Sequence, residues 1–391
     1  MKIGIITFHG TWNCGAVLQC AALKRKLENM GHEAVVINYR PHYWIEKFKK
    51  YPNPLKMAAA AVKKSQPKSL PAKVKLAART VAQTVYKYKP KSGRLTRKAK
   101  FEDFVSANLK QTKVYHTVDE LRKDPPRCDV YISGSDQLWN PKLTNGEIDE
   151  AYFLAFGDES VKRVGYAISA CQLDVWKDED RLSGLLSGFD NISLRETDLK
   201  PELEKLYGRD IDICIDPTLL LQKEDYSGFE AACNELDEPY LLVYAFGEPA
   251  SRELLFSTVK HYKEKYNLKV KVLSGPGKWP FEVDFYYPRE GVSPGEFLSY
   301  IKNAELVITN SFHATVFSVL YEKEFYTVPV PGREGRIAGL LSGIGLSDRF
   351  IQTGAQLNDR DDGGKIDYQS AAQKLEKLRE TSNDYLKRVL G

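Results

Sequence analysis

The residue pattern best suited to chemistry lies at residues 307–314, where an apolar run ends in Asn310, Ser311, Phe312 and His313. This pattern predicts a buried strand that runs directly into the first turn of a helix. In open α/β sheets ligands bind at such points, and the free amides of a first helical turn attract anions. A histidine there can exchange a proton and also face a negative charge. We therefore interpret this turn as an anion site in which His313 is the reactive group.

A second polar cluster follows another expected strand, within residues 133–141. Its hydrogen-bonding groups and aromatic face suit a sugar ring, and they belong to Ser135, Asp136, Gln137, Trp139 and Asn140. Asp136 can serve as a general base or orient a hydroxyl. A structural role is equally compatible with the sequence, with Asp136 capping a following helix and Trp139 filling the core.

The loop at residues 8–16 is a third candidate. Its glycines, Gly15 among them, let the backbone approach a ligand, and the amides of Asn13 and Gln19 can bind sugar hydroxyls. The loop has neither the GxGxxG spacing nor the Gly-Lys-Ser/Thr of nucleotide-binding loops. A plain tight turn explains it as well.

Three arginines are candidates for holding an anion. Arg195 directly follows an expected strand, and its guanidinium can fork onto a carboxylate or phosphate. The alternative for Arg195 is an ion pair with Glu196 or Asp216. Arg333 and Arg336 lie in a segment expected to be a flexible loop, which either closes over an anion or is solvated.

Short apolar strands alternate with helices along most of the chain. Expected strands lie at 2–7, 33–38, 129–133, 163–168, 191–194, 211–215, 240–246, 269–273, 305–309 and 325–328. This alternation is typical of parallel sheets covered on both faces. We expect an α/β fold whose halves, 1–220 and 221–360, meet at a ligand-binding cleft. Asn13 is expected to cap one helix, and Ser293 and Glu296 to form a capping box that opens another. A last amphipathic helix within 361–391 is expected to pack back on the first half.

Composition narrows the class of protein. The 391 residues are 42% apolar, and no apolar run approaches the roughly 18 residues of a membrane span. The first residues indicate a strand and not a signal peptide. Six scattered cysteines without metal-binding spacing indicate a reducing cytosol and predict no metal site. There is also no Gly-x-Ser-x-Gly or His-Glu-x-x-His motif, which disfavours nucleophilic triads and metal-dependent hydrolysis.

Residues 43–100 form a strongly basic insertion. They contain 17 lysines and arginines against one acid, Glu46, whereas the whole chain has a net charge of only +5. Short, partly helical pieces are expected here. The insertion is either a solvated excursion or a surface for anionic lipid or a pyrophosphate-linked substrate. Nucleic acid is disfavoured, because no nucleic-acid-binding motif is present.

Taken together and in this order, the loops resemble the polysaccharide pyruvyl transferase family. The resemblance is carried by Trp12-Asn-Cys-Gly15, Ser133-Gly-Ser-Asp-Gln-Leu-Trp-Asn140, Ser193-Leu-Arg-Glu196 and Asn310-Ser-Phe-His-Ala314. It implies two Rossmann-like domains facing a cleft, as in B-type glycosyltransferases. The implied reaction moves pyruvate from phosphoenolpyruvate onto two hydroxyls of one cell-envelope sugar as a ketal, with no cofactor.

The resemblance also implies residue roles. The family's donor-binding arginine matches Arg195 and its essential histidine matches His313, but a second family arginine is Ser311 here. Arg333 or Arg336 is a candidate for the missing charge. The expected donor site is Arg195, Asn310, Ser311, Phe312, His313, Arg333 and Arg336. The expected acceptor site, for a nucleotide- or lipid-linked saccharide, is Asn13, Gly15, Gln19, Ser135, Asp136, Gln137, Trp139 and Asn140.

The chemistry of a ketal-forming transfer fits these residue types. It needs a proton donor, a base and clamps for anions, and we assign them to His313, Asp136 and Arg195. Two other functions stay open at this point. One is a B-type glycosyltransferase that uses a nucleotide sugar, and the other is a carbohydrate-binding relative without turnover. The expected location is the cytoplasm, with the insertion able to reach the inner membrane surface.

Overall fold

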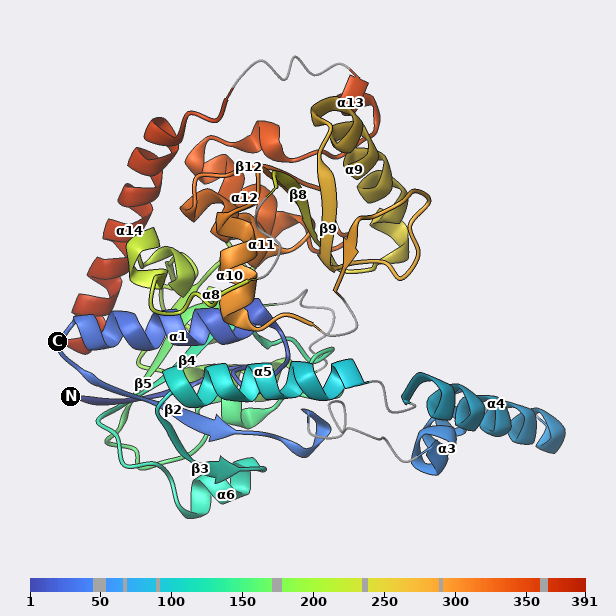
Figure 1. Cartoon of the computed structure of the whole chain (residues 1–391). Coiled ribbons are helices and arrows are strands. Elements are labelled where there is room, and N and C mark those ends of the chain that lie inside the picture. The colour runs from blue at the N-terminus through green and yellow to red at the C-terminus, as the bar shows by residue number, and fades with distance from the viewer. Residues whose placement is uncertain are drawn as a thin grey trace.

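Two α/β domains are stacked on each other in the computed structural model, and a helical hairpin projects from one of them (Figure 1). The structure describes residues 1–44, 54–65, 69–88, 92–170, 178–233, 238–287, 291–358 and 365–391. Part of the expected insertion and Cys171 therefore lie outside the described residues. The five described cysteines are not in disulfides.

The first domain is built on a seven-stranded sheet in the order β3-β2-β1-β4-β5-β6-β7. All its neighbouring strands pair in parallel; Ile3, for example, lies between Ala34 and Val130. The strands are β1 (Lys2–Ile6), β2 (Glu33–Tyr39), β3 (Gln111–Tyr115), β4 (Val130–Trp139), β5 (Lys162–Ala170), β6 (Asn191–Leu194) and β7 (Asp212–Ile213). The order reverses direction between β1 and β4, which is the switch point where doubly wound sheets bind ligands.

The second domain repeats this arrangement with a five-stranded parallel sheet, β10-β9-β8-β11-β12. Its strands are β8 (Tyr240–Tyr244), β9 (Lys269–Ser274), β10 (Phe285–Tyr286), β11 (Leu306–Thr309) and β12 (Glu324–Thr327). Its switch point lies between β8 and β11, directly before the Asn310 turn. Both domains are thus Rossmann-like, as expected.

The helices cover the sheets and connect the strands. They are α1 (Cys14–Asn29), α5 (Ser92–Asn108), α6 (Val118–Lys123), α7 (Glu179–Ser187) and α8 (Lys200–Tyr207) in the first domain, and α9 (Arg252–Tyr266), α10 (Pro294–Lys302), α11 (Phe312–Leu320), α12 (Glu334–Ile344) and α13 (Ala355–Asn358) in the second. The expected caps are present. Asn13 accepts a hydrogen bond from Ala16 N, and Ser293 and Glu296 form a capping box.

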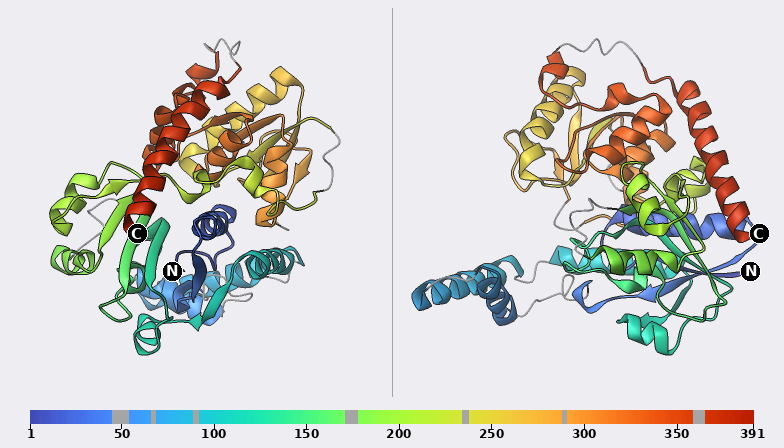
Figure 2. Two further views of the ribbon diagram at one scale, coloured as in Figure 1. Left: turned by 90° about the vertical axis from the view of Figure 1, so that its left-hand side faces the viewer. Right: turned by 180° about the vertical axis from the view of Figure 1, so that it is seen from behind.

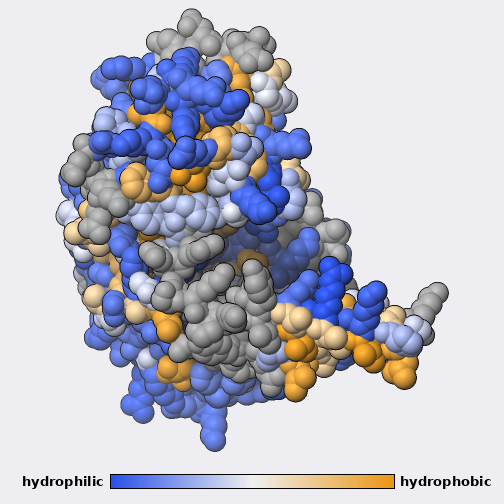
Figure 3. Space-filling view, turned by 45° about the vertical axis from the view of Figure 1, so that its right-hand side comes forward, coloured by the Kyte–Doolittle hydropathy of each residue, from blue (hydrophilic) through white to orange (hydrophobic). Residues whose placement is uncertain are grey.

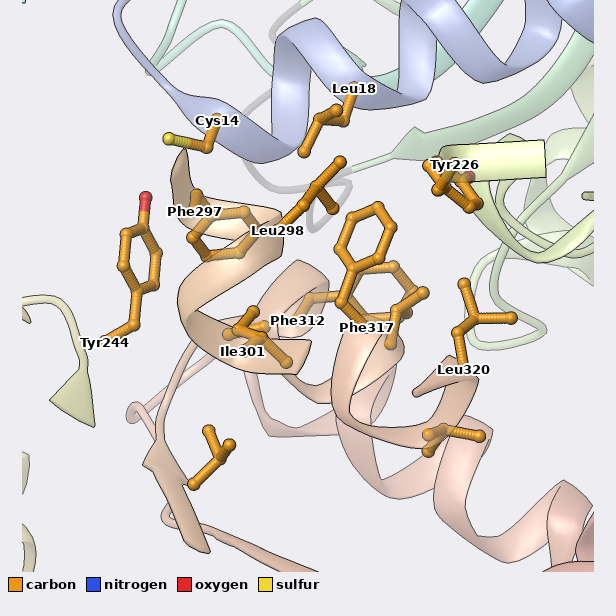
Figure 4. Packing of buried hydrophobic residues seen from close by; sticks show 14 of the residues in the cluster. Cys14, Leu18, Tyr226, Tyr244, Phe297, Leu298, Ile301, Phe312, Phe317 and Leu320 are labelled. Atoms are coloured by element: carbon orange, nitrogen blue, oxygen red, sulfur yellow. The ribbon is translucent and has the colours of Figure 1, made fainter. Parts of the chain in front are cut away.

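Apolar side chains of both domains join in one core cluster between the sheets. Figure 4 shows Cys14 and Leu18 of α1 next to Phe297 and Leu298 of α10, with Phe312 of α11 close by. Burying side chains of this size stabilises by roughly 1.5–3 kcal/mol each. The first turns of α1 and α11 are therefore held against each other by packing.

The last helix, α14 (Tyr368–Leu390), runs along both domains (Figure 2). Its first half packs on α12. Near its end, Tyr385 Oη donates to Gly165 O at 2.8 Å and Arg388 pairs with Asp212 at 2.7 Å. The chain thus crosses back from the second domain to the first.

Three segments differ from the expected pattern. β4 continues through residues 134–139, where a loop was expected, because the nine-residue β5 pairs with it as far as Trp139. Arg336 lies in the first turn of α12 and not in a flexible loop, since Ile337, Leu341 and Ile344 anchor that helix in the core. In the expected insertion, α5 is part of the body, with Phe101 and Phe104 buried.

Candidate active site

The expected ligand cleft lies between the carboxyl ends of the two sheets. A cavity of about 240 Å³ is lined from the first domain by Trp12, Asn13, Asp136 and Gln137, and from the second by Asn310, Ser311, Phe312, His313, Arg333 and Arg336. A second cavity of about 470 Å³ adjoins it and shares Gln137, Arg333 and Arg336, with Glu196 and Asn140 also in its wall. Volumes of this size suit small-molecule ligands.

His313 sits in the first turn of α11, where the buried strand β11 ends. Ser311 is the N-cap, and its Oγ accepts from Ala314 N at 3.5 Å. Because the other first-turn amides have no partner within the helix, the turn presents donors and a positive dipole end to the cleft. Asn310 holds the turn in place through both of its amide atoms, which bond to Phe246 N at 2.6 Å and Phe246 O at 3.0 Å.

A buried carboxylate joins His313 to Arg195. Oδ2 of Asp216 lies 2.5 Å from Nη1 of Arg195 and 3.5 Å from Nε2 of His313, and Asp216 is fully buried. Its other oxygen accepts from the amide and hydroxyl of Thr218 at 3.0 and 2.6 Å. Arg195 of the first domain and His313 of the second therefore both contact the Asp216 carboxylate.

Charges in this cluster shift the pKa of two carboxyls in opposite directions. Burial opposes ionisation of Asp216, but the charges of His313 and Arg195 outweigh it, and its pKa lies well below the usual range. For Glu196, which accepts from the Ser169 hydroxyl, burial dominates over Arg195 and raises the pKa. Asp216 is thus a fixed negative charge, whereas Glu196 is suited to exchange a proton.

Several buried polar atoms at this cluster have no hydrogen-bond partner among the described residues. They are Nε and Nη2 of Arg195, Nε2 of His313 and Oε2 of Glu196. Leaving such atoms unpaired costs roughly 1–3 kcal/mol each, and more when they are charged. Their nearest partners lie at ion-pair distance, 3.5 Å from Nε2 of His313 to Asp216 and 3.7 Å from Nε of Arg195 to Oε2 of Glu196.

Arg195 lies beneath the cleft, and Arg336 lines it. The guanidinium of Arg195 stacks on the Phe312 ring at 4.6 Å, and only 3% of its side chain is exposed. Arg336 borders both cavities. When the Gln137 amide is oriented with its oxygen toward Arg336, that oxygen accepts from both Nη atoms at 3.1 Å. Burial and then the neighbouring Arg195 charge lower the pKa of Arg336 to about 10. Arg336 thus presents positive charge to the cleft, and the Arg195 guanidinium lies behind it among the carboxylates of Asp136, Glu196 and Asp216.

The expected acceptor residues fall into two groups. Asn13, Asp136, Gln137 and Asn140 line the cavities. Gln19, Ser135 and Trp139 are buried and bonded inside the first domain: Gln19 bonds to Thr7 and Ser135 N, Ser135 Oγ to Ala167 O, and Trp139 Nε1 to Tyr152 O. We therefore place these three beneath the site and not in contact with an acceptor.

Asp136 remains the carboxylate best placed on the acceptor side of the cleft. Its backbone is left-handed, with φ of 86°. Its Oδ1 accepts from Gln137 N at 2.8 Å and lies 3.9 Å from Nη2 of Arg195. The carboxylate is thus oriented by the bulged end of β4 and reaches the same cluster as His313.

Gly15 is needed where α1 meets α11. A Cβ atom built on Gly15 would lie 2.2 Å from Nδ1 of His313. We expect Gly15→Ala to force the two helices apart, to cost about 1–3 kcal/mol of stability and to reduce turnover at least tenfold. Gly10→Ala is the control, since its Cβ would meet Arg40 at an ordinary 3.6 Å. Thermal unfolding and turnover measure both, and equal behaviour of the two variants would contradict this contact.

Two members of the cluster were not among the expected site residues. Asp216 and Glu196 were considered only as ion-pair partners of Arg195, and the pair with Asp216 is present. A signal was present for each: both lie within three residues of the end of a short strand, at the same sheet edge as Arg195. Their carboxylates, together with the cations, give the cleft the means to hold an anion and move a proton.

Comparison with known proteins points to one family. Residues 13–330 match the family described as polysaccharide pyruvyl transferase. No curated protein sequence matches the chain significantly. Among solved structures, similar chains include the glycotransferase of kitacinnamycin (12% identity, TM-score 0.45, covering 99% of this chain and 98% of the other). S. aureus MnaA with UDP is also similar (11% identity, TM-score 0.48, covering 97% of this chain and 90% of the other). So is the spinosyn rhamnosyltransferase SpnG with thymidine diphosphate (12% identity, TM-score 0.42, covering 100% of both chains).

Proposed function

Because the chain belongs to the polysaccharide pyruvyl transferase family, we propose that this transferase uses phosphoenolpyruvate to place a pyruvate ketal on a sugar. The sugar belongs to a cell-envelope polysaccharide or to its precursor. The family match supports a saccharide acceptor, and the charge of the cleft supports the donor. Phosphoenolpyruvate carries a carboxylate and a phosphate, and the cleft offers Arg336 and the amides of the α11 turn, with the Arg195 guanidinium directly beneath them.

The proposed reaction proceeds in three steps. A proton is added to the methylene carbon of phosphoenolpyruvate, which becomes a methyl group and leaves positive charge on the central carbon. One sugar hydroxyl attacks that carbon and gives up its proton to a base. Phosphate then departs, and the second hydroxyl closes the ketal ring and releases its proton. The products are one ketal and one inorganic phosphate, and no cofactor or metal is needed.

The residues with proposed roles in these steps lie on both sides of the cleft. We assign His313 as the proton donor or phosphate partner, with the Asp216 carboxylate stabilising positive charge on its ring. Arg195 and Arg336 neutralise the donor. Asp136 is the candidate base for the sugar hydroxyl, and Glu196, whose pKa is raised by burial, is a second group able to take or give a proton.

The observation that carries this proposal is the meeting of Arg195, Asp216 and His313 across the domain boundary, directly beside a cleft lined by His313 and Arg336. The test is mass spectrometry of a panel of cell-envelope sugars incubated with the protein and phosphoenolpyruvate. We expect one acceptor to gain pyruvate with loss of water and release of phosphate. Turnover of a nucleotide sugar, with phosphoenolpyruvate untouched, would instead establish a glycosyltransferase.

The helical hairpin supports a location at the cytoplasmic face of a membrane. It consists of α3 (Pro54–Ser65) and α4 (Leu70–Tyr88), which pack on each other and project from the body (Figure 1). Residues 54–65 and 69–83 carry six basic residues and no acid. Apolar residues gather along one side of the projection (Figure 3), with Leu55, Leu70 and Val74 at least 60% exposed. None of the described helices is long and apolar enough to cross a bilayer.

Charge reversal on the hairpin should release the protein from anionic vesicles. Each lysine near such a surface contributes about 1 kcal/mol, so Lys63→Glu/Lys64→Glu should weaken binding by more than tenfold. Flotation with phosphatidylserine vesicles at low and high salt measures it. The control is Lys260→Glu/Lys377→Glu, which changes the net charge by the same amount but on α9 and α14, away from the hairpin. This variant should float like the parent protein. Loss of flotation in both variants would mean that overall charge, and not the hairpin, binds the vesicle.

A further inference from the structure

A third cavity lies beside the cleft, on the first domain, and the proposed reaction does not use it. Its volume is about 500 Å³. Its walls are mostly apolar and aromatic, and they include Phe8, Trp12, Pro41, Trp44, Val114 and Tyr152. We propose that this cavity binds the first isoprenoid units of a lipid carrier to which the acceptor sugar is linked through phosphate. The proposal rests on the proposed function and names the class of acceptor.

The cavity is continuous with the reaction site. Phe8, Thr11, Trp12 and Trp44 belong to the walls of both this cavity and the His313 cavity. A ligand can therefore place a sugar beside His313 and extend its other end over the Trp12 loop. Ligands that contain both a sugar and an apolar tail have the shape required.

The cavity also lies at the base of the hairpin. Lys98 and Glu102 of α5 form part of its wall, and α5 follows the hairpin in the chain. On the same helix, Arg97 donates to Trp12 O at 2.8 Å, and Lys100 pairs with Glu296 of the second domain at 2.7 Å. In Figure 3 the surface is hollowed between the domains beside the root of the projection. A hairpin resting on a membrane would bring this opening close to the lipid.

The hydrogen bonds inside the cavity favour an isoprenoid over a nucleotide base. Arg40 Nε donates to Asn38, Nδ1 of His116 bonds to Arg40 O, and Tyr39 Oη bonds to Asp149. The hydroxyls of Thr7 and Thr11 donate to backbone carbonyls. These polar groups are already used within the fold, and a buried base without partners would lose its hydrogen bonds to water. An apolar chain needs none, and the carrier phosphate can be met by Lys98, whose side chain is half exposed in a 3.3 Å pair with Glu102.

Val114 allows the proposal to be tested at the rim of the cavity. It lies on the edge strand β3 with 45% of its surface exposed, and it is not part of the His313 cavity. Val114→Glu adds a negative charge to the apolar wall at a position where folding tolerates it, and Val114→Leu keeps the wall apolar. The probe is farnesyl pyrophosphate, a short water-soluble isoprenoid. Its binding is followed by the fluorescence of the tryptophans in the wall.

We expect saturable binding of farnesyl pyrophosphate that Val114→Glu weakens at least tenfold and Val114→Leu preserves, with unfolding temperatures unchanged. Inorganic pyrophosphate and UDP should bind more weakly than the farnesyl compound. Equal binding by Val114→Glu, or stronger binding of UDP than of the isoprenoid, would overturn the proposal. Pyruvyl transfer to a lipid-free saccharide, measured on the unaltered protein, reports on the proposed function separately, because the fluorescence assay needs no turnover.

Discussion

His313→Ala is expected to lower the rate of pyruvyl transfer about 100-fold or more while the protein stays folded. Removing one preorganised electrostatic contact from a buried site commonly has an effect of this order. His313 is the only imidazole in the described cleft walls, and its Nε2 lies 3.5 Å from the Asp216 carboxylate. The fold should survive, because Asp216 keeps its 2.5 Å pair with Arg195 and its bonds from Thr218.

The measurement is phosphate release from phosphoenolpyruvate with the acceptor found by mass spectrometry, together with thermal unfolding of each variant. His32→Ala, a histidine substitution just after α1, should match the parent protein in both assays. His313→Gln, which keeps a hydrogen-bonding side chain but no titratable ring, should stay close to His313→Ala in rate. A rate within threefold of the parent protein for His313→Ala would remove this residue from the reaction.

Local patterns in the sequence predicted the framework of the site. The Asn13 cap, the Ser293–Glu296 capping box and the strand that ends before Asn310 all lie where they were expected. Each depends on residues within a few positions of one another, since caps and strand ends are set by local hydrogen bonding. In each parallel sheet the carboxyl ends of the strands lie at one edge, so the residues that follow the strands were expected to lie close together.

Long-range partners could not be predicted in the same way. Asp216 meets Arg195 because β6 and β7 are neighbours, and it meets His313 only because α1 and α11 pack across the domain boundary (Figure 4). The close approach at Gly15 has the same origin. Such contacts depend on how the domains dock, which no local periodicity encodes. The extended β4 was missed for a similar reason, because its partner β5 decides its length.

The prediction from the charge pattern was correct for only part of the basic segment. The basic segment at 43–100 was expected to be one excursion, yet its end belongs to the body as α5, whose buried Phe101 and Phe104 fix it there. Apolar residues at helical spacing were the relevant signal, and the many lysines masked it. Likewise the glycines and prolines around Arg333 suggested a loop, although Ile337, Leu341 and Ile344 have helical spacing.

Arg336→Ala should remove most of the donor affinity without lowering stability. Burial and the adjacent Arg195 lower the pKa of Arg336 to about 10 from its ordinary 12.5. A lowered pKa in a cation means that its charged form is disfavoured in the folded state, so carrying this charge at neutral pH costs folding free energy. Removing it should leave the unfolding temperature equal or higher. The charge is retained, on this reasoning, because a doubly negative donor relieves the repulsion between Arg336 and Arg195.

Arg195 is less suitable for this test. Its loss would leave the buried Asp216 carboxylate without its guanidinium partner and lower the folding stability by about 3–5 kcal/mol. For Arg336, the readout is the rise in unfolding temperature with added phosphoenolpyruvate. At 100 times the dissociation constant, a ligand stabilises by about 2.7 kcal/mol, and Arg336→Ala should lose most of that rise. Arg252→Ala is the control, because Arg252 is exposed in the first turn of α9 and lines neither cavity, so this variant should keep the rise. If both variants respond to phosphoenolpyruvate like the parent protein, the donor does not bind between the two guanidiniums.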